Sequence, residues 1–285
     1  MKEKSLTSTA FWAMVRRDLL VQWRDKWEFV FRVGMLPFIL ILVYGYMLPA
    51  VGILPENFPT HMFCGMIGMS MLITGIHGTA VPISMDFHNL REIEDRLLAP
   101  VSSHTVAFAK MFVGVLESFI GGLIVLPISL IFMGSRISIQ MTAGSIPLLL
   151  LALALIALDS AALGLLVGTI VKPSQIAAMF PGFLMPVVFL GAIFYTWKQL
   201  APIPVMQVIT LANPLTWVNE AIRGIMTPQI DSLPLSLTLP GIAVWILVLG
   251  LIAFRRFDRM VYNTTKLTPD FEVRIYTLYK QKQSS

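Results

Sequence analysis

The sequence is poor in charge, because Asp, Glu, Lys and Arg make up only 13% of its 285 residues. A soluble globular domain is about one-quarter charged, so this composition argues against a soluble protein. The chain has a single cysteine, Cys64, which excludes an intrachain disulfide. What remains is apolar: 56% of the residues are hydrophobic and the mean hydropathy is +0.77. These values indicate an integral membrane protein.

The sequence also lacks the phosphate-binding motif G-x-x-x-x-G-K-[ST], so this chain has no P-loop for ATP. No nucleophile constellation of an enzyme is present, and the four histidines lack metal-ligand spacing. We therefore expect no catalytic residue, no metal and no cofactor in this chain. The histidines are His61, His77, His88 and His104.

Long apolar runs predict an all-α membrane protein with six transmembrane helices, since a span needs roughly 20 mostly apolar residues. The predicted spans are 33–54, 62–85, 105–133, 145–171, 176–197 and 239–254. Together they form a transmembrane domain over 33–254. The last span is short unless it begins near Leu235.

Lysine and arginine determine the predicted orientation. If the N-terminus is cytoplasmic, every lysine and arginine except Arg136, Lys198 and Arg223 falls on the cytoplasmic side. Both termini are therefore predicted to be cytoplasmic. This topology explains the net charge of +5 without nucleic acid as a partner.

The two ends of the chain are more polar than its centre. Residues 1–32 are predicted to form an amphipathic helix on the cytoplasmic membrane surface, acting as an anchor or in a mechanical role. Residues 255–285 are predicted to form a basic cytoplasmic tail. The apolar stripe of the N-terminal helix consists of Phe11, Val15, Leu19, Trp23, Trp27 and Phe31.

A highly charged segment, 86–98, separates the second and third predicted spans. It can form a helix that Pro100 ends, with apolar residues at 3–4 spacing and charges of both signs between them. Such a helix suits a groove on a soluble partner, and the alternative is a solvated elbow with internal ion pairs. The candidate docking residues are Phe87, Leu90, Arg91, Glu92, Glu94, Asp95, Arg96, Leu97 and Leu98.

The predicted outer segment, 198–238, is apolar but interrupted by five prolines. We expect short broken helices that re-enter the outer leaflet, which requires protein or a cavity to cover the backbone. Glu220 and Arg223 are spaced to pair within one helix. The segment is predicted to act as an outer gate or, alternatively, as a structural plug. The candidate gate residues are Tyr195, Asn213, Pro214, Trp217, Glu220 and Arg223.

Two acids and one histidine lie inside predicted spans: Glu117, Asp159 and His77. Each acid is about 12 residues from the cytoplasmic end of its span, or ~18 Å at the helical rise. Intramembrane acids mark structural hydrogen bonds, a wet translocation path or a proton relay, and spacing does not choose among these. Gly164 and Gly168 form a G-x-x-x-G pair that predicts close helix packing.

Two stretches resemble one known family. "LREIEDRLLAPVSSHTVAFAK" (90–110) and "NPLTWVNEAIRGIM" (213–226) are similar to segments of type-2 permeases of ATP-binding-cassette (ABC) exporters. The pattern is most similar to nodulation-factor, drug and polysaccharide export permeases. The chain departs from the family where "REIEDR" replaces the frequent "E-x-G-T".

The resemblance implies a permease in the cell inner (cytoplasmic) membrane that forms a homodimer with a second permease chain. It implies two copies of a separate ABC ATPase subunit, which binds ATP and Mg, and a coupling role for residues 86–98. The substrate would be an amphipathic drug, lipid or glycolipid, with membrane lipid around the protein. The alternatives are a proton-coupled secondary transporter using Glu117, Asp159 and His77, and a membrane-anchored assembly protein without transport.

Overall fold

The computed structural model describes residues 2–88 and 102–267, and within these ranges the chain is helical without strands. Five helices there are long and apolar enough to cross a membrane, which confirms the all-α membrane class. They are Lys26–Ala50, Phe58–Phe87, Ser103–Arg136, Ala143–Gly168 and Leu235–Asn263. The predicted span 176–197 is not among them.

The N-terminal region is two helices rather than one. Helix α1, Lys2–Arg24, ends before Asp25, and α2, Lys26–Leu40, begins directly after it. The chain then continues through a π-helical segment, η1 (Ile41–Met47), into α3 (Leu48–Ala50). The first membrane helix therefore begins at Lys26, seven residues before the predicted position 33.

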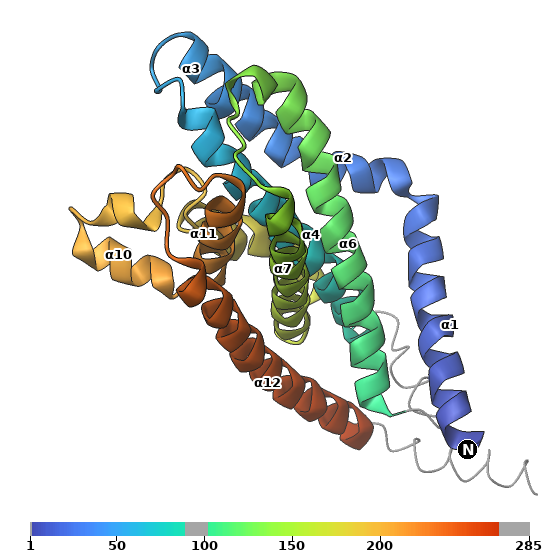
Figure 1. Cartoon of the computed structure of the whole chain (residues 1–285). Helices are drawn as coiled ribbons and strands as arrows, with labels where there is room; N and C mark the ends of the chain where they lie inside the picture. The colour runs from blue at the N-terminus through green and yellow to red at the C-terminus, as the bar shows by residue number, and fades with distance from the viewer. Residues whose placement is uncertain (1, 89–101, 268–285) are drawn as a thin grey trace, which may run out of the picture.

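Helix α1 lies alongside α6, Ser103–Met133 (Figure 1). The first half of its apolar stripe makes this contact, since Val15 is buried with Ala109 and Val113 of α6. The second half, which continues into α2, does not, because Trp23 of α1 is 71% and Trp27 of α2 is 78% exposed. The stripe is therefore divided between an internal contact and an outward-facing surface.

The centre of the molecule consists of α4 (Phe58–His88), α6 and α7 (Ile146–Gly168), which pack extensively on one another. The G-x-x-x-G pair of α7 faces α4, as its spacing predicts. A Cβ on Gly164 would lie 2.9 Å from the Ile76 carbonyl oxygen, and one on Gly168 would lie 2.9 Å from that of Ala80. These glycines let the two backbones approach closely.

The predicted fifth span is a series of short helical pieces: η4 (Pro173–Gln175), α8 (Ile176–Met179), η5 (Phe180–Leu184) and α9 (Met185–Phe189). The chain leaves the helix after Phe189, and Ala192 has a positive φ of 53°. Three further short helices follow in the outer segment: η6 (Trp197–Leu200), α10 (Pro204–Leu211) and α11 (Pro214–Met226). Broken helices were predicted there, and their depth in the bilayer stays a prediction.

The last helix, α12 (Leu235–Leu267), begins where the sixth span needed to begin and extends well past it. Residues 255–267 are therefore helical and continuous with the last span. Phe257 packs edge-on against Phe87 of α4, with ring centroids 5.5 Å apart. His104 Nε2 lies 3.0 Å from Asp258 Oδ1.

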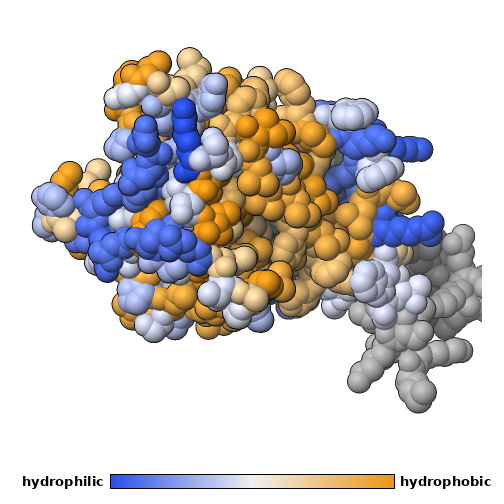
Figure 2. Space-filling view, turned by 45° about the horizontal axis from the view of Figure 1, so that its top comes forward, coloured by the Kyte–Doolittle hydropathy of each residue, from blue (hydrophilic) through white to orange (hydrophobic). Residues whose placement is uncertain are grey.

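The surface matches a membrane protein. Figure 2 shows hydrophobic side chains over a broad area in the middle of this face, between hydrophilic side chains at its left and right. The N-terminus, the start of α6 and the C-terminal end of α12 lie together at one end of the molecule (Figure 1). The loop after α3 and the loop between α6 and α7 lie at the opposite end.

Candidate functional site

Helix α11 carries most of the predicted gate residues, and the sequence Asn213-Pro214 determines where it starts. Asn213 is the N-cap, and its side-chain oxygen accepts a hydrogen bond from the Leu215 amide at 3.0 Å. Pro214 occupies the first turn, where its missing N–H costs nothing. The predicted helix break at this dipeptide is confirmed, because α10 ends at Leu211.

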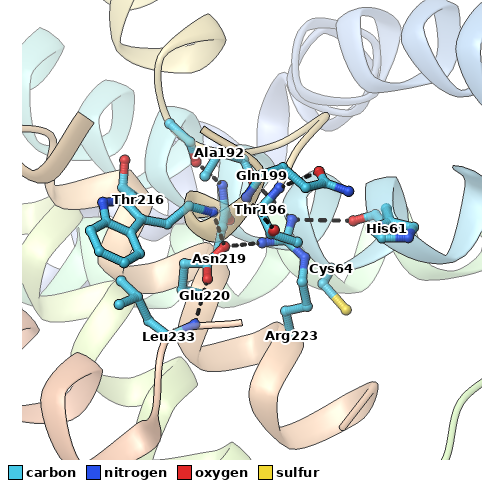
Figure 3. Close-up of polar contacts among 12 residues, drawn as sticks. His61, Cys64, Ala192, Thr196, Gln199, Thr216, Asn219, Glu220, Arg223 and Leu233 are labelled. Atoms are coloured by element: carbon cyan, nitrogen blue, oxygen red, sulfur yellow. Dashed lines mark hydrogen bonds and ion pairs between the residues drawn. The ribbon is translucent and has the colours of Figure 1, made fainter. Parts of the chain in front are cut away.

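Glu220 and Arg223 form an ion pair with no exposed side-chain surface. Arg223 Nη2 also donates to the carbonyl oxygen of Ala192 at 2.8 Å and to that of His61 at 3.3 Å. Figure 3 shows this guanidinium between Glu220 and His61. The arginine therefore joins α11 to the start of α4 and to the loop after α9.

Glu220 accepts two further hydrogen bonds from the backbone. Its Oε1 accepts from the Trp197 amide at 3.1 Å, and its Oε2 accepts from the Leu233 amide at 2.7 Å. A buried ion pair is tolerated when further hydrogen bonds satisfy its remaining polar atoms. This pair thus holds the loop after α9, the start of η6 and the loop before α12 around one helix.

Four side chains, those of the N-cap Asn213 and of three α11 residues, donate hydrogen bonds to carbonyl groups in α9 and directly after it. The last carbonyls of a helix have no partner within the helix and need one from elsewhere. Here the donors come from one face of α11, at 3–4 residue spacing. Asn213 contacts Val187 O at 2.7 Å, Thr216 contacts Leu190 O at 3.3 Å, Asn219 contacts Gly191 O at 2.6 Å and Arg223 contacts Ala192 O.

Thr216 and Asn219 were not predicted as site residues. The available signal was a polar residue at every third or fourth position, 213, 216, 219 or 220 and 223, in a helix whose other positions are largely apolar. We refer to these four donors, Asn213, Thr216, Asn219 and Arg223, as the outer clamp.

Tyr195 and Trp217, the remaining gate candidates, also bind backbone carbonyls. Tyr195 Oη donates to Phe189 O at 3.2 Å, and Trp217 Nε1 donates to Leu211 O at 2.9 Å. All six predicted gate residues therefore belong to the region between α9 and α11. Their role as a gate stays a prediction.

Only the first residues of the predicted docking helix, 86–88, are described, and they form the end of α4. Phe87 is buried against Phe257 at the end of α4, so it does not belong to an exposed ridge. The other candidates, Leu90, Arg91, Glu92, Glu94, Asp95, Arg96, Leu97 and Leu98, lie outside the described residues.

A cavity of about 440 Å³ lies between α1, α2, α4 and α6, and His77 and Glu117 line it. A second cavity of about 290 Å³ shares both residues and extends to Ile176 of α8. Gln22 of α1 donates a hydrogen bond to Glu117 Oε1. Glu117 is therefore reached by the N-terminal helix, which sequence spacing did not indicate.

Asp159 stands apart from these two residues. It is fully buried in α7, it lines neither cavity, and neither of its carboxyl oxygens has a hydrogen-bond partner among the described residues. The matched depths predicted for Glu117 and Asp159 thus do not bring them into one described cavity.

Nearer the start of α6 than Glu117, a lysine links this helix to α1 and α4. Lys110 Nζ of α6 lies 2.7 Å from Asp18 Oδ2 of α1 and 3.3 Å from Asp86 Oδ2 of α4, and its side chain is only 3% exposed. We refer to Asp18, Asp86 and Lys110 as the inner triad. Two carboxylates on one ammonium hold α1 to the base of the α4–α6 pair.

Known proteins match most of this chain. Residues 9–227, from α1 through the outer clamp, match the family described as ABC-2 type transporter. The chain is 28% identical over 197 residues to the inner membrane transport permease YadH of Escherichia coli (strain K12), covering 68% of this chain and 73% of that protein. YadH of Shigella flexneri matches to the same extent. Since the family match spans well over half of the residues, the chain belongs to the ABC-2 type transporter family.

Proposed function

We propose that this chain is the permease subunit of an ABC transporter that exports an amphipathic substrate across the inner membrane. The observation that carries the proposal is the family match over 9–227 in a chain without a P-loop. Because the chain has no phosphate-binding motif of its own, the power source is a separate ATPase subunit. The relatives are named inner membrane transport permeases, and this name supports the inner membrane as the location of this chain.

The ATPase binds at the segment between α4 and α6. Both helices have 31 residues, or ~46 Å at the helical rise, which exceeds the ~30 Å bilayer core. Their length is therefore sufficient for a projection beyond the membrane at the end where 89–101 connects them. The charges of both signs in that segment supply the register of docking.

Two permease chains and two ATPase subunits make up the working transporter, and the outer clamp is its gate. Nucleotide binding moves the docking segment, and α4 transmits this movement to His61, where Arg223 is bound. The substrate class is an amphipathic drug, lipid or glycolipid. Direction requires that the inward-facing and outward-facing states differ in substrate affinity.

Co-purification tests the proposal. The His-tagged chain, extracted in mild detergent from a strain that also expresses a candidate P-loop ATPase, is expected to bring that ATPase with it. Arg91→Glu with Arg96→Glu is expected to abolish recovery of the ATPase, since it reverses two charges of the docking segment. Lys280→Glu with Lys282→Glu, in the C-terminal tail, is the control that keeps the complex.

Two outcomes contradict the proposal. One is that no P-loop ATPase accompanies the native chain, and the other is that both double variants recover the ATPase equally. Transport then separates the mechanisms: ABC export into inverted vesicles is blocked by vanadate and persists with a protonophore, whereas a proton-coupled carrier behaves in the opposite way.

A further inference from the structure

The two inner cavities adjoin one another and have mixed walls. Phe29, Arg32, His77 and Glu117 line both. The larger cavity opens beside the charged α1–α2 corner, and the smaller one is bordered by Val33, Ile73 and Ile176. A charged mouth that leads to an apolar end matches a molecule with one polar head and one apolar body.

The charge of the larger cavity is unbalanced. Five carboxylate side chains line it, against three cationic ones, so negative charge is in excess by two when all are ionised and His77 is neutral. The carboxylates are Asp18, Asp25, Glu28, Asp86 and Glu117.

The cations of this cavity do not offset the excess. Lys110 is already held between Asp18 and Asp86, which leaves that triad with one negative charge. Arg17 and Arg32 are the other two cations, and they face three carboxylates. An anionic ligand would therefore enter against the prevailing charge.

Glu117 independently indicates a ligand. Its side chain is only 1% exposed, and Gln22 binds just one of its carboxyl oxygens. The other, Oε2, is buried without a hydrogen-bond partner among the described residues. A buried carboxylate oxygen without a donor is unfavourable, so it marks a position where a donor from outside the chain is stabilising.

We propose that these cavities bind a cationic amphiphile, whose ammonium head donates to Glu117 Oε2 and whose apolar body extends between α2 and α8. Phe29 lines both cavities and supplies an apolar wall for the body of the ligand, while the Arg32 guanidinium lies over its ring at 5.9 Å. The proposal rests on the export function and narrows its substrate class from amphiphiles in general to organic cations.

Probe binding in lipid nanodiscs tests this site without the ATPase. The probe is a dansyl fluorophore on an alkyl chain that ends in a primary ammonium, and its matched counterpart ends in a carboxylate. Binding is read as fluorescence gain over empty nanodiscs. The native chain is expected to bind the ammonium probe about tenfold more tightly than the carboxylate probe.

Glu117→Gln keeps the shape of the side chain and removes its charge. It is expected to lower the affinity for the ammonium probe about tenfold. The affinity for the carboxylate probe is expected to stay unchanged or to rise. Asp159→Asn removes another buried acid that does not line the cavities, and is expected to change neither affinity. Glu28→Gln, at an exposed position at the mouth, is expected to weaken the ammonium probe by a few-fold and does not threaten folding.

The proposal is overturned if the native chain binds the two probes with equal affinity. It is also overturned if Glu117→Gln and Asp159→Asn lower the affinity for the ammonium probe equally. Neither result affects the export function, which depends on recovery of the ATPase. If the ammonium site is found but no ATPase accompanies the chain, the site stands and the export function fails.

Discussion

At the scale of single residues, the polar side chains of the outer clamp donate hydrogen bonds to backbone carbonyl groups at the end of the apolar helix α9. The helix α9 ends at Phe189, and the carbonyl groups at and directly after its end have no partner within the helix. Side chains of α11 supply the hydrogen bonds instead, and the guanidinium of Arg223 contributes to two segments at once. The Asn213-Pro214 dipeptide and Arg223 of the family-like motif therefore have a structural explanation.

Removing one member of the buried pair is expected to be more harmful than removing both. Arg223→Gln leaves the Glu220 carboxylate buried without its cation, and is expected to cost about 3–5 kcal/mol of unfolding free energy. Glu220→Gln with Arg223→Gln is expected to cost less than Arg223→Gln alone, because no unpaired charge remains. Thermal unfolding in nanodiscs measures both.

The exposed pair Lys198–Asp231 on the same side of the protein is the matched control. Lys198→Gln is expected to change stability by less than about 1 kcal/mol, because exposed ion pairs contribute little. If Arg223→Gln is as mild as Lys198→Gln, the clamp does not hold the outer segment together. Transport and ATP turnover that stay unchanged in the single and double pair variants would exclude a gate.

At the scale of elements, the close approach of α4 and α7 depends on glycine. A Cβ at position 164 would lie 2.8 Å from Thr79 Cβ and 2.9 Å from Ile76 O. Gly164→Ala is therefore expected to destabilise the protein by about 1–3 kcal/mol through overpacking. Gly250→Ala, in α12 where the added methyl meets open space, is expected to be neutral or slightly stabilising. Unfolding temperatures compare the two.

The inner triad makes a second prediction about elements. Lys110→Met leaves Asp18 and Asp86 facing each other without a cation, and is expected to release α1 from α6 at a cost of about 3 kcal/mol. Limited proteolysis after Arg16 and Arg17 is expected to become faster. Lys172→Met, at an exposed position, is the control that leaves proteolysis unchanged. Restoration by Asp18→Asn with Asp86→Asn in the Lys110→Met background separates charge from packing.

Sequence patterns predicted elements better than they predicted ends of elements. Hydropathy indicated three spans, 62–85, 105–133 and 145–171, within a few residues of their observed bounds, and the i,i+3 spacing indicated the Glu220–Arg223 pair. The end of the 176–197 run was missed because residues 190–195 are as apolar as those before them, and only contacts with α11 show where the helix stops. Asp25 was likewise too weak a signal for the break between α1 and α2.

Contacts between distant parts of the sequence were beyond prediction. Nothing in the spacing of α1 indicates that Gln22 meets Glu117 or that Asp18 meets Lys110. The apolar stripe of α1 indicated a membrane surface, and its first half instead meets α6. Pairing of helix faces depends on rotation about each axis, which hydropathy does not determine.

At the scale of the whole molecule, the orientation in the membrane is testable because Cys64 is the single cysteine and is buried. Introduced cysteines therefore report on their own positions. In sealed right-side-out vesicles, Lys198→Cys is expected to react with a membrane-impermeant maleimide and Glu92→Cys is not. Inverted vesicles are expected to reverse this pattern.

The native chain is the control and is expected to remain unlabelled on both sides. Labelling of Glu92→Cys from the outside would contradict the cytoplasmic position of the docking segment. It would also remove the physical basis for an ATPase at that end, because P-loop subunits bind nucleotide in the cytoplasm.

The contact between Gln22 and Glu117 joins positions 95 residues apart in the chain. During translation, α1 leaves the ribosome first but has no surface to pack on until α6 has entered the bilayer. The apolar stripe of α1 therefore has no α6 surface to pack on while the spans Lys26–Ala50 and Phe58–Phe87 are inserted. During biosynthesis, α1 is thus expected to bind the insertion machinery or the lipid surface until α6 is inserted and can pack against it.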